Sequence, residues 1–400
     1  PNGSPTMVVP DVPLVPFPGD YPVAAFGDAA CMAPATAYER FGDLDLLRRQ
    51  LPSMAAWARC VAGEGLAGFP PPGFRFGDWL DPPAPPDNPE NGLTEYDVVM
   101  AFGAVRSVSL ALAAAGEVGD AGLERELAAL REELLAWVDR ELVTGSGLVA
   151  GDSQTAYALA LHTGALAPAK RRRAFDRLVE LLRRRGVLQA GYPGTYALME
   201  VLVEHGRTDL AHRLLGATGV PSWRYAVRLG ATTFWERWDS MLADGRLNPG
   251  DMLSFNHPVF AGVTDWMHRV LGGLAPAAPG YRRVRVAPQP GGGVTWARTA
   301  HRTPYGTVEV SWSLTDVFRL EVDVPPGVTA EVLLTTHGLP EHRLGFDGVE
   351  VDAADVIADG ARGAEALGWT RQRHIVGLCA LQAGVGAGAV ALTATYTSEP

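Results

Sequence analysis

The spacing of apolar residues changes once along this chain, and the change restricts the folds that it can adopt. From residue 95 to about 217, apolar residues recur every three or four positions, as on amphipathic helices. After residue 280 they alternate with polar residues, as in strands that bury one face. Helices followed by strands predict a mainly α protein, with a helical domain at residues 1–275 and a small antiparallel β-sandwich at residues 281–400.

The helical part is predicted to consist of paired helices that share no repeated motif. A solenoid would show such a repeat, so the pairing favours a closed toroid or barrel of helices. Pro-rich stretches at residues 1–23 and 68–92 and a Pro/Ala/Gly linker at residues 272–280 interrupt the regular segments. Helices are expected at residues 95–117, 120–142, 152–163, 168–185, 194–205, 208–216 and 257–273.

Charge and composition argue against several functions. The net charge of −11 disfavours a nucleic-acid or anionic-membrane partner, and with no run of 18 apolar residues no membrane span is expected. The three cysteines are too scattered for a disulfide framework and the nine histidines lack ligand spacing, so no metal is expected. The chain also lacks a phosphate loop, a dinucleotide fingerprint and a Gly-x-Ser-x-Gly elbow, so no cofactor is expected and a serine hydrolase is disfavoured.

The stretch ATTFWERWDSM, residues 231–241, is the strongest candidate for chemistry. It places Glu236 and Arg237 between Trp235 and Trp238, a pattern that suits neither an amphipathic helix nor an alternating strand. One interpretation is that the charged pair is exposed or ion-paired while the indoles belong to the core. The other is a sugar site, because aromatic faces stack on the C–H faces of a sugar and a carboxylate withdrawn from water can act as a base.

Three other stretches combine polar and aromatic residues in a similar way. FGDWLDP places Asp78 beside Trp79 in a Pro-rich loop. In DMLSFNHPVF, His257 stands at a helix start, where it either caps the helix, packs in the core or contacts a ligand. In GDSQTAYAL, Asp152 is predicted to be a helix N-cap, with Gln154 as a supporting polar group.

Taken in order, these motifs resemble the α-L-rhamnosidases of glycoside hydrolase family 78. The resemblance extends nearly end to end and is carried by AFGDAACMAPATAYERFGDLD, FGDWLDP, DSQTAYALAL, GATTFWERWDS, SFNH and APGYRRVRVAPQP. Of these, the pair GATTFWERWDS and SFNH is the most specific. The resemblance implies an (α/α)6 toroid catalytic domain followed by a small β-sandwich. It also implies removal of terminal α-L-rhamnose from a rhamnose-containing glycoside, with inversion of configuration.

The resemblance also implies roles for individual residues. Glu236 corresponds to the general base that activates a water, and His257 to a residue that contacts the sugar. Trp79 corresponds to an aromatic wall of the sugar site, with Asp78 beside it. Where the family usually has Trp in a WGDA motif, this chain has Phe26, which implies a different affinity or aglycone preference. Two further candidates for the pocket lining are Trp235 and Trp238.

The general acid of the family has no counterpart in residues 1–400. Its motif, Asp-x-x-x-Arg-x-Glu, is expected on a segment upstream of residue 1. The chain is then the C-terminal part of a longer enzyme, a subunit completed by a second polypeptide, or a divergent toroid. We expect the first, because residue 1 is proline and a toroid without its first helices would expose an apolar seam. The functional alternatives are a non-hydrolytic rhamnoside-binding protein and a toroid glycosidase of another specificity.

Overall fold

The computed structural model describes residues 3–5, 24–67, 76–333, 344–346, 378–382 and 389–394. Contacts within the chain divide it into two compact units. The first, called the helical unit below, comprises Pro1–Thr36 and Leu44–Val263. The second, called the β unit, comprises Ala37–Asp43 and Thr264–Pro400. The domain limits inferred from the sequence, 1–275 and 281–400, stay a prediction.

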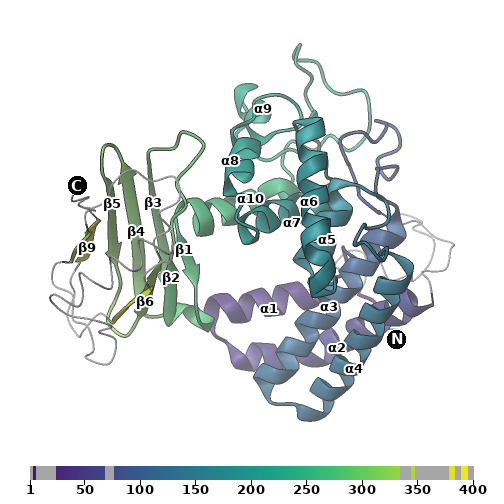
Figure 1. Ribbon diagram of the computed structural model, residues 1–400, viewed down its shortest axis with the longest axis horizontal. Coiled ribbons are helices and arrows are strands. Elements are labelled where there is room, and N and C mark those ends of the chain that lie inside the picture. The colour runs from purple at the N-terminus through teal and green to yellow at the C-terminus, as the bar shows by residue number, and fades with distance from the viewer. Residues whose placement is uncertain are drawn as a thin grey trace. The chain divides into compact units, whose positions relative to one another are not determined.

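Helices form most of the regular structure of the helical unit (Figure 1). Between residues 95 and 217 they begin and end within about two residues of the bounds expected from apolar spacing. They are α1 (Ala29–Phe41), α2 (Leu44–Leu66), α3 (Tyr96–Val118), α4 (Ala121–Glu141), α5 (Gln154–His162), α6 (Pro168–Arg185), α7 (Tyr192–Glu204), α8 (Thr208–Gly216) and α9 (Trp223–Arg228).

Two local expectations about helices were wrong. Helix α9 lies between the helices expected at 208–216 and 257–273, where no helix was expected, and the Ser222 hydroxyl caps it by accepting from the Tyr225 N–H. The single helix predicted at 257–273 is a succession of three short elements with different hydrogen-bond periods. These are a 3₁₀ turn (Pro258–Ala261), α10 (Gly262–Trp266) and a π-helical turn (Met267–Leu271).

Helices α3, α5 and α7 form the interior of the helical unit, with α4, α6 and α8 packed against them in turn (Figure 1). In α5 every residue from Gln154 to Leu161 is buried, as expected of an interior helix. Helix α3 has the length and apolar composition of a membrane span, but 72% of that apolar window is buried inside the structure. Outer helix α6 instead buries a single stripe, made of Ala174, Phe175, Leu178, Val179 and Leu182.

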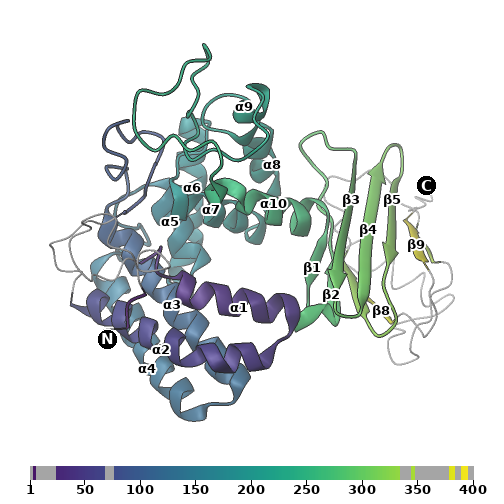
Figure 2. The same cartoon turned by 180° about the vertical axis from the view of Figure 1, so that it is seen from behind.

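The described strands of the β unit form two sheets, and Figure 2 shows β3, β4 and β5 side by side. One sheet has the order β1-β2-β6-β8 and the other β3-β4-β5-β9-β7. All described pairs are antiparallel, as predicted, except β2 and β6, which run parallel. The strands are β1 (Leu274–Pro276), β2 (Arg283–Val286), β3 (Trp296–Thr303), β4 (Gly306–Leu314), β5 (Phe318–Asp323), β6 (Thr329–Leu333), β7 (Leu344–Phe346), β8 (Leu378–Gln382) and β9 (Ala389–Ala394).

The alternating pattern that predicts these strands is visible in their burial. In β5 the residues alternate between buried and exposed along the whole strand, beginning with buried Phe318. In β4, Trp312 is buried and its indole N–H donates to the Leu271 carbonyl at 2.8 Å. Strand β1 lies inside the segment that was expected to be a linker. Its composition is rich in Ala and Pro, but its backbone pairs with β2.

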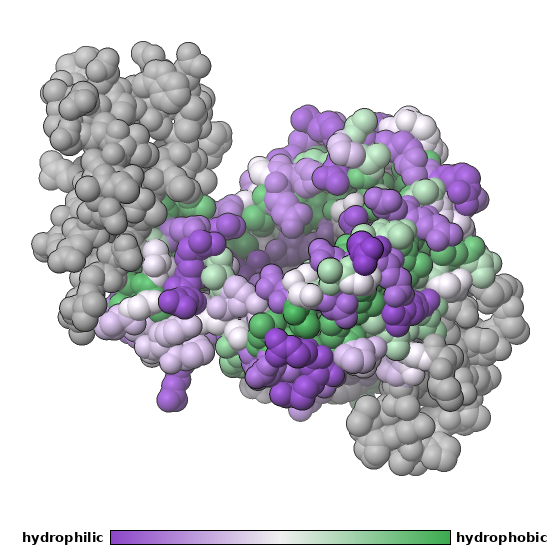
Figure 3. Space-filling model, turned by 90° about the horizontal axis from the view of Figure 1, so that it is seen from below, coloured by the Kyte–Doolittle hydropathy of each residue, from purple (hydrophilic) through white to green (hydrophobic). Residues whose placement is uncertain are grey.

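One face of the molecule, seen in Figure 3, shows hydrophilic residues interspersed with smaller hydrophobic areas. Among the described residues, large apolar side chains that are well exposed come from distant parts of the chain, such as Phe41, Val227, Leu247 and Trp296. Isolated exposed apolar residues are normal on protein surfaces and indicate no docking site by themselves.

Candidate active site

Asp78, one of the residues singled out in the sequence, lies where the interior helices begin. Asp78 and Thr94 precede α3, Ser153 precedes α5, and Gly191 precedes α7. Asp78 joins these segments, because its Oδ1 accepts from the Gly191 N–H at 3.0 Å and its Oδ2 from the Thr94 hydroxyl at 3.1 Å. The Thr94 and Ser153 hydroxyls are 2.6 Å apart. Hydrogen bonds therefore hold the N-terminal ends of three interior helices together.

Glu236 is held by a short pairing of two loop segments. Its N–H donates to the Ser254 carbonyl at 2.8 Å, and the His257 N–H donates to the Phe234 carbonyl at 2.9 Å. The Ser254 N–H donates to Glu236 Oε2 at 3.0 Å, which orients the carboxylate. Glu236 Oε1 lies 3.9 Å from His257 Nε2, and the side chains are 13% and 35% exposed, respectively. The two most specific motifs of the sequence thus meet at one partly open carboxylate–imidazole pair.

His257 fills one of the three roles considered for it, that of a cap. It is the N-cap of the 3₁₀ turn at Pro258–Ala261, and its Nδ1 accepts from the Val259 N–H at 3.3 Å. In the neutral imidazole this hydrogen bond places the proton on Nε2, the nitrogen that faces Glu236. Capping is therefore confirmed by the geometry, whereas contact with a sugar stays a prediction.

Asp78 is fully buried rather than directed to solvent. Burial, followed by the charge of Asp81, raises its pKa well above the ordinary value for aspartate. The pKa of Asp81 is also raised by burial, although the Leu93 N–H donates to its Oδ2 at 2.8 Å. The hydrogen bonds of the two carboxyls brace the loop that carries Trp79, whereas a substrate-binding role of Asp78 stays a prediction.

Trp79 belongs to a group of three aromatic rings. The Phe76 ring meets the Trp79 ring edge-on at a centroid distance of 5.0 Å and lies 4.3 Å from the Phe26 ring. Phe26 and Trp79, both predicted site residues, are therefore connected through Phe76, which the sequence analysis did not select. The sequence feature that could have identified Phe76 is its position in the FGDW motif, three residues before Trp79.

Trp235 and Trp238 are both buried, at 6% and 7% exposure. The Trp235 ring meets Phe255 edge-on at 5.2 Å. The Trp238 ring stacks on Phe260 at 3.9 Å and meets Trp223 edge-on at 5.2 Å. These contacts pack the loop around Glu236. A role of either indole in lining a sugar pocket stays a prediction.

Comparison with known proteins identifies the family. Residues 1–271 match the bacterial α-L-rhamnosidase six-hairpin glycosidase domain, and residues 273–343 match the bacterial α-L-rhamnosidase C-terminal domain. The chain belongs to the bacterial α-L-rhamnosidase family. An α-L-rhamnosidase of Streptomyces avermitilis is 37% identical over 313 residues, which cover 78% of this chain and 29% of that protein. One from Alteromonas sp. is 32% identical over 327 residues, with 78% and 35% covered.

Solved rhamnosidase structures share the fold of this family member. That of the native Aspergillus terreus enzyme has a TM-score of 0.81 and 29% identity, over 97% of this chain and 41% of that one. That of the Streptomyces avermitilis enzyme complexed with L-rhamnose has a TM-score of 0.78 and 32% identity, over 98% and 34%. The prediction of an (α/α)6 toroid followed by a small β domain is confirmed. The chain spans about a third of the length of the relatives that it matches.

Two side chains of this rhamnosidase-family chain support the site but escaped the sequence analysis as site residues. Arg237, 6% exposed, donates from one guanidinium nitrogen to the Pro86 carbonyl at 3.1 Å and the Asp251 carbonyl at 3.3 Å. It thereby ties the residue after Glu236 to the loop that carries Trp79. The second residue, Tyr192, contacts both segments. Neither role has a local signal, since the acceptors are backbone carbonyls far away in sequence.

The predicted capping role of Asp152 was wrong. Helix α5 begins at Gln154, two residues later than expected, and the Ser153 hydroxyl caps it by accepting from the Ala156 N–H at 3.0 Å. Asp152 instead accepts two hydrogen bonds from Arg177, at 2.9 and 2.6 Å. Gln154 is a buried brace, because its amide donates to the Val187 carbonyl and accepts from the Gln189 N–H.

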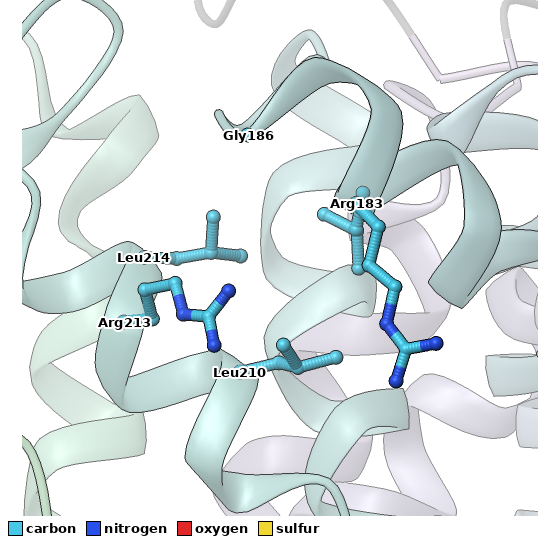
Figure 4. Close-up of a pocket in the computed structure, with 6 residues that line it drawn as sticks. Arg183, Gly186, Leu210, Arg213 and Leu214 are labelled. Carbon is cyan, nitrogen blue, oxygen red and sulfur yellow. The ribbon is translucent and has the colours of Figure 1, made fainter.

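A small pocket of this chain is lined by none of the site residues described above. It is formed between α6 and α8, and Figure 4 shows Leu210 and Leu214 beside it with the side chains of Arg183 and Arg213. None of the predicted site residues lines it. Within the described ranges no group of three or more His, Cys, Asp or Glu side chains could hold a metal ion.

Proposed function

We propose that the natural protein hydrolyses terminal α-L-rhamnosides with inversion, and that Glu236 is the general base. The observation that carries the proposal is the Glu236–His257 pair, at the junction of the two most specific motifs, in a chain of this family. The relatives named α-L-rhamnosidase support the reaction and the sugar. The assignment of roles to residues is our inference from the resemblance of the motifs, and the geometry of the pair is compatible with it.

The carboxylate of Glu236 is arranged to bind a water. The Ser254 N–H occupies Oε2 and fixes the plane of the carboxylate. Among the described residues none donates a hydrogen bond to Oε1, and His257 Nε2 stays 3.9 Å away, beyond direct hydrogen-bond distance. A water placed at Oε1 would lose its proton to Glu236 as its oxygen attacks the anomeric carbon. His257 Nε2–H would hydrogen-bond to that water or to a sugar hydroxyl.

We propose that the apolar surface for the sugar comes from the aromatic group of Phe26, Phe76 and Trp79, in which both phenyl rings are half-buried and Trp79 is 6% exposed. A sugar ring presents apolar C–H faces that stack on aromatic rings, while its hydroxyls need polar partners. We assign Trp79 to this stacking role. Phe26 lacks the indole N–H of the tryptophan usual in the family, so it contributes apolar area without a donor.

Inversion requires a second carboxyl group, which acts as an acid and protonates the leaving oxygen. The two carboxyl groups lie roughly 6.5–9.5 Å apart in inverting enzymes. We propose that this acid lies outside the 400 residues, on an upstream segment or a second polypeptide that completes the site. The length of the relatives, of which this chain spans about a third, supports that proposal.

The proposal is tested by replacing Glu236 in the natural polypeptide with Gln, which keeps the shape and removes the base. Hydrolysis of a chromogenic α-L-rhamnoside should fall at least about a thousand-fold, because general-base catalysis and water activation are lost together. Asp251→Asn is the matched control, since it removes an exposed carboxylate from the same loop. Equal rates for Glu236→Gln and the unchanged protein would disprove the assignment.

A second measurement tests the stereochemistry. Proton NMR during the first minutes of the reaction should show β-L-rhamnose as the first product, before mutarotation, if a water attacks directly. First formation of the α-anomer would contradict inversion. Rhamnose binding without any hydrolysis by the natural polypeptide would favour the non-hydrolytic alternative.

A further inference from the structure

Tyr192 is the residue that connects the two halves of the candidate site. It is the first residue of α7, and its backbone N–H donates to the Trp79 carbonyl at 3.0 Å. At its other end, its hydroxyl donates to the Glu236 carbonyl at 2.9 Å. One residue therefore connects the two loops, through its backbone to the loop of the aromatic group and through its side chain to the loop of the carboxylate.

The ring of Tyr192 also contacts the imidazole side of the site. Its centroid lies 5.8 Å from the His257 ring and 5.3 Å, edge-on, from the Phe260 ring. Burial, followed by the charge of Glu236, raises the pKa of the phenol above its ordinary value. The hydroxyl therefore stays a hydrogen-bond donor throughout the pH range in which a glycosidase works.

The segment that Tyr192 holds has little other regular support. Residues 231–257 lie outside helices and strands, apart from an isolated bridge between Met241 and Leu247. Without the Tyr192 hydroxyl, the position of Glu236 would depend on its backbone pairing with Ser254 and on Arg237 next to it. Small displacements of a catalytic group cost large factors in rate, so this hydrogen bond is well placed to matter for catalysis.

We propose that Tyr192 is a positioning residue, which sets the distance from Glu236 and His257 to Trp79 by bonding to both loops. The proposal rests on the proposed function of Glu236. It predicts a specific kinetic effect, because the sugar still stacks on Trp79 when the base is displaced. Turnover should suffer, while the apparent affinity for the substrate changes little.

The test is Tyr192→Phe in the natural polypeptide, which removes the hydroxyl and keeps the ring. The chain offers a matched control, Tyr225→Phe. The Tyr225 hydroxyl also donates to a backbone carbonyl, that of Met241, at 2.9 Å, and it is likewise part-buried. Both variants lose the same type of bond, so both should lower Tm by a similar amount, about 2 °C.

With a chromogenic α-L-rhamnoside, Tyr192→Phe should lower kcat about ten-fold and leave KM within about two-fold. Tyr225→Phe should keep both constants within about two-fold of the unchanged protein. Equal kcat values for the two variants, or a Tyr192→Phe defect confined to KM, would overturn the positioning role while leaving the proposed function standing. An unchanged protein without hydrolytic activity would overturn both proposals together.

Discussion

At the scale of single residues, Asp78 is a buried carboxyl that connects two segments of the chain. Both of its oxygens are engaged, one with the Gly191 N–H and one with the Thr94 hydroxyl. A Cβ at Gly191 would lie 2.7 Å from Asp78 Oδ1 and 2.5 Å from the Trp79 carbonyl. Only glycine therefore allows α7 to begin so close to the loop that carries Trp79.

The raised pKa of Asp78 predicts a pH-dependent stability. The folded state keeps the proton at pH values where an unfolded aspartate, with a pKa of about 3.9, has lost it. Stability contributed by this group is therefore complete below about pH 4 and falls as pH rises toward its folded pKa. The free energy of unfolding of Asp78→Asn should therefore depend less steeply on pH than that of the unchanged protein.

Urea unfolding at pH 5 and pH 8 measures the slope. Asp87→Asn, which changes an exposed carboxylate of the same loop, is the control. If Asp78→Asn and Asp87→Asn gave the same pH dependence as the unchanged protein, Asp78 would not be the buried titrating group.

At the scale of elements, the site depends on where the interior helices begin. The Ser153 hydroxyl caps α5 and also lies 2.6 Å from the Thr94 hydroxyl, which in turn bonds to Asp78. Ser153 thus caps the start of α5 and connects it to the loop before α3. The N-terminal ends of α3 and α5 are therefore connected by side-chain hydrogen bonds in addition to the cap.

This coupling predicts different costs for two similar substitutions. Ser153→Ala should lower the free energy of unfolding by about 2–3 kcal/mol, since it removes a cap and leaves the Thr94 hydroxyl short of a buried partner. Ser222→Ala removes only the cap of α9 and should cost about 1 kcal/mol, although Ser222 is equally buried. Equal losses in urea unfolding would show that the Thr94–Ser153 contact contributes nothing.

At the scale of the whole molecule, all the candidate site residues fall within the helical unit. The β unit has its own buried side chains, such as Leu320 in β5, which has no exposed surface. We therefore expect a substitution in the core of the β unit to leave the geometry of the site unchanged. A matched pair of core substitutions tests this expectation.

Leu320→Ala in β5 and Leu198→Ala in α7 each truncate a side chain with 0% exposure. Both should lower the free energy of unfolding by about 2–5 kcal/mol. At a temperature where both variants are folded, Leu320→Ala should keep kcat within about two-fold, whereas Leu198→Ala should lower it, since α7 carries Tyr192. Calorimetry and rhamnoside hydrolysis on the same samples check this, and a large kcat loss in Leu320→Ala would contradict it.

The amino-acid sequence was enough to predict the order, type and approximate bounds of most elements, because apolar spacing and the positions of Gly and Pro act locally. It also singled out Glu236 and His257 through an unusual local composition. The hydrogen bonds that connect the segments of the site depend on the tertiary fold. Asp78 meets Gly191 across 113 positions and Arg237 meets Pro86 across 151, and no local pattern encodes which backbone group a side chain reaches.

The cap of α5 shows the same limit at short range. Asp152 and Ser153 are both suited to an N-cap, so the sequence could not choose between them by side-chain type. Arg177, 25 positions away, binds both carboxylate oxygens of Asp152, and the cap falls to Ser153. Asp152 Oδ1 also accepts from the Tyr157 hydroxyl at 2.9 Å, so both carboxylate oxygens have side-chain partners that the local cap preference does not encode.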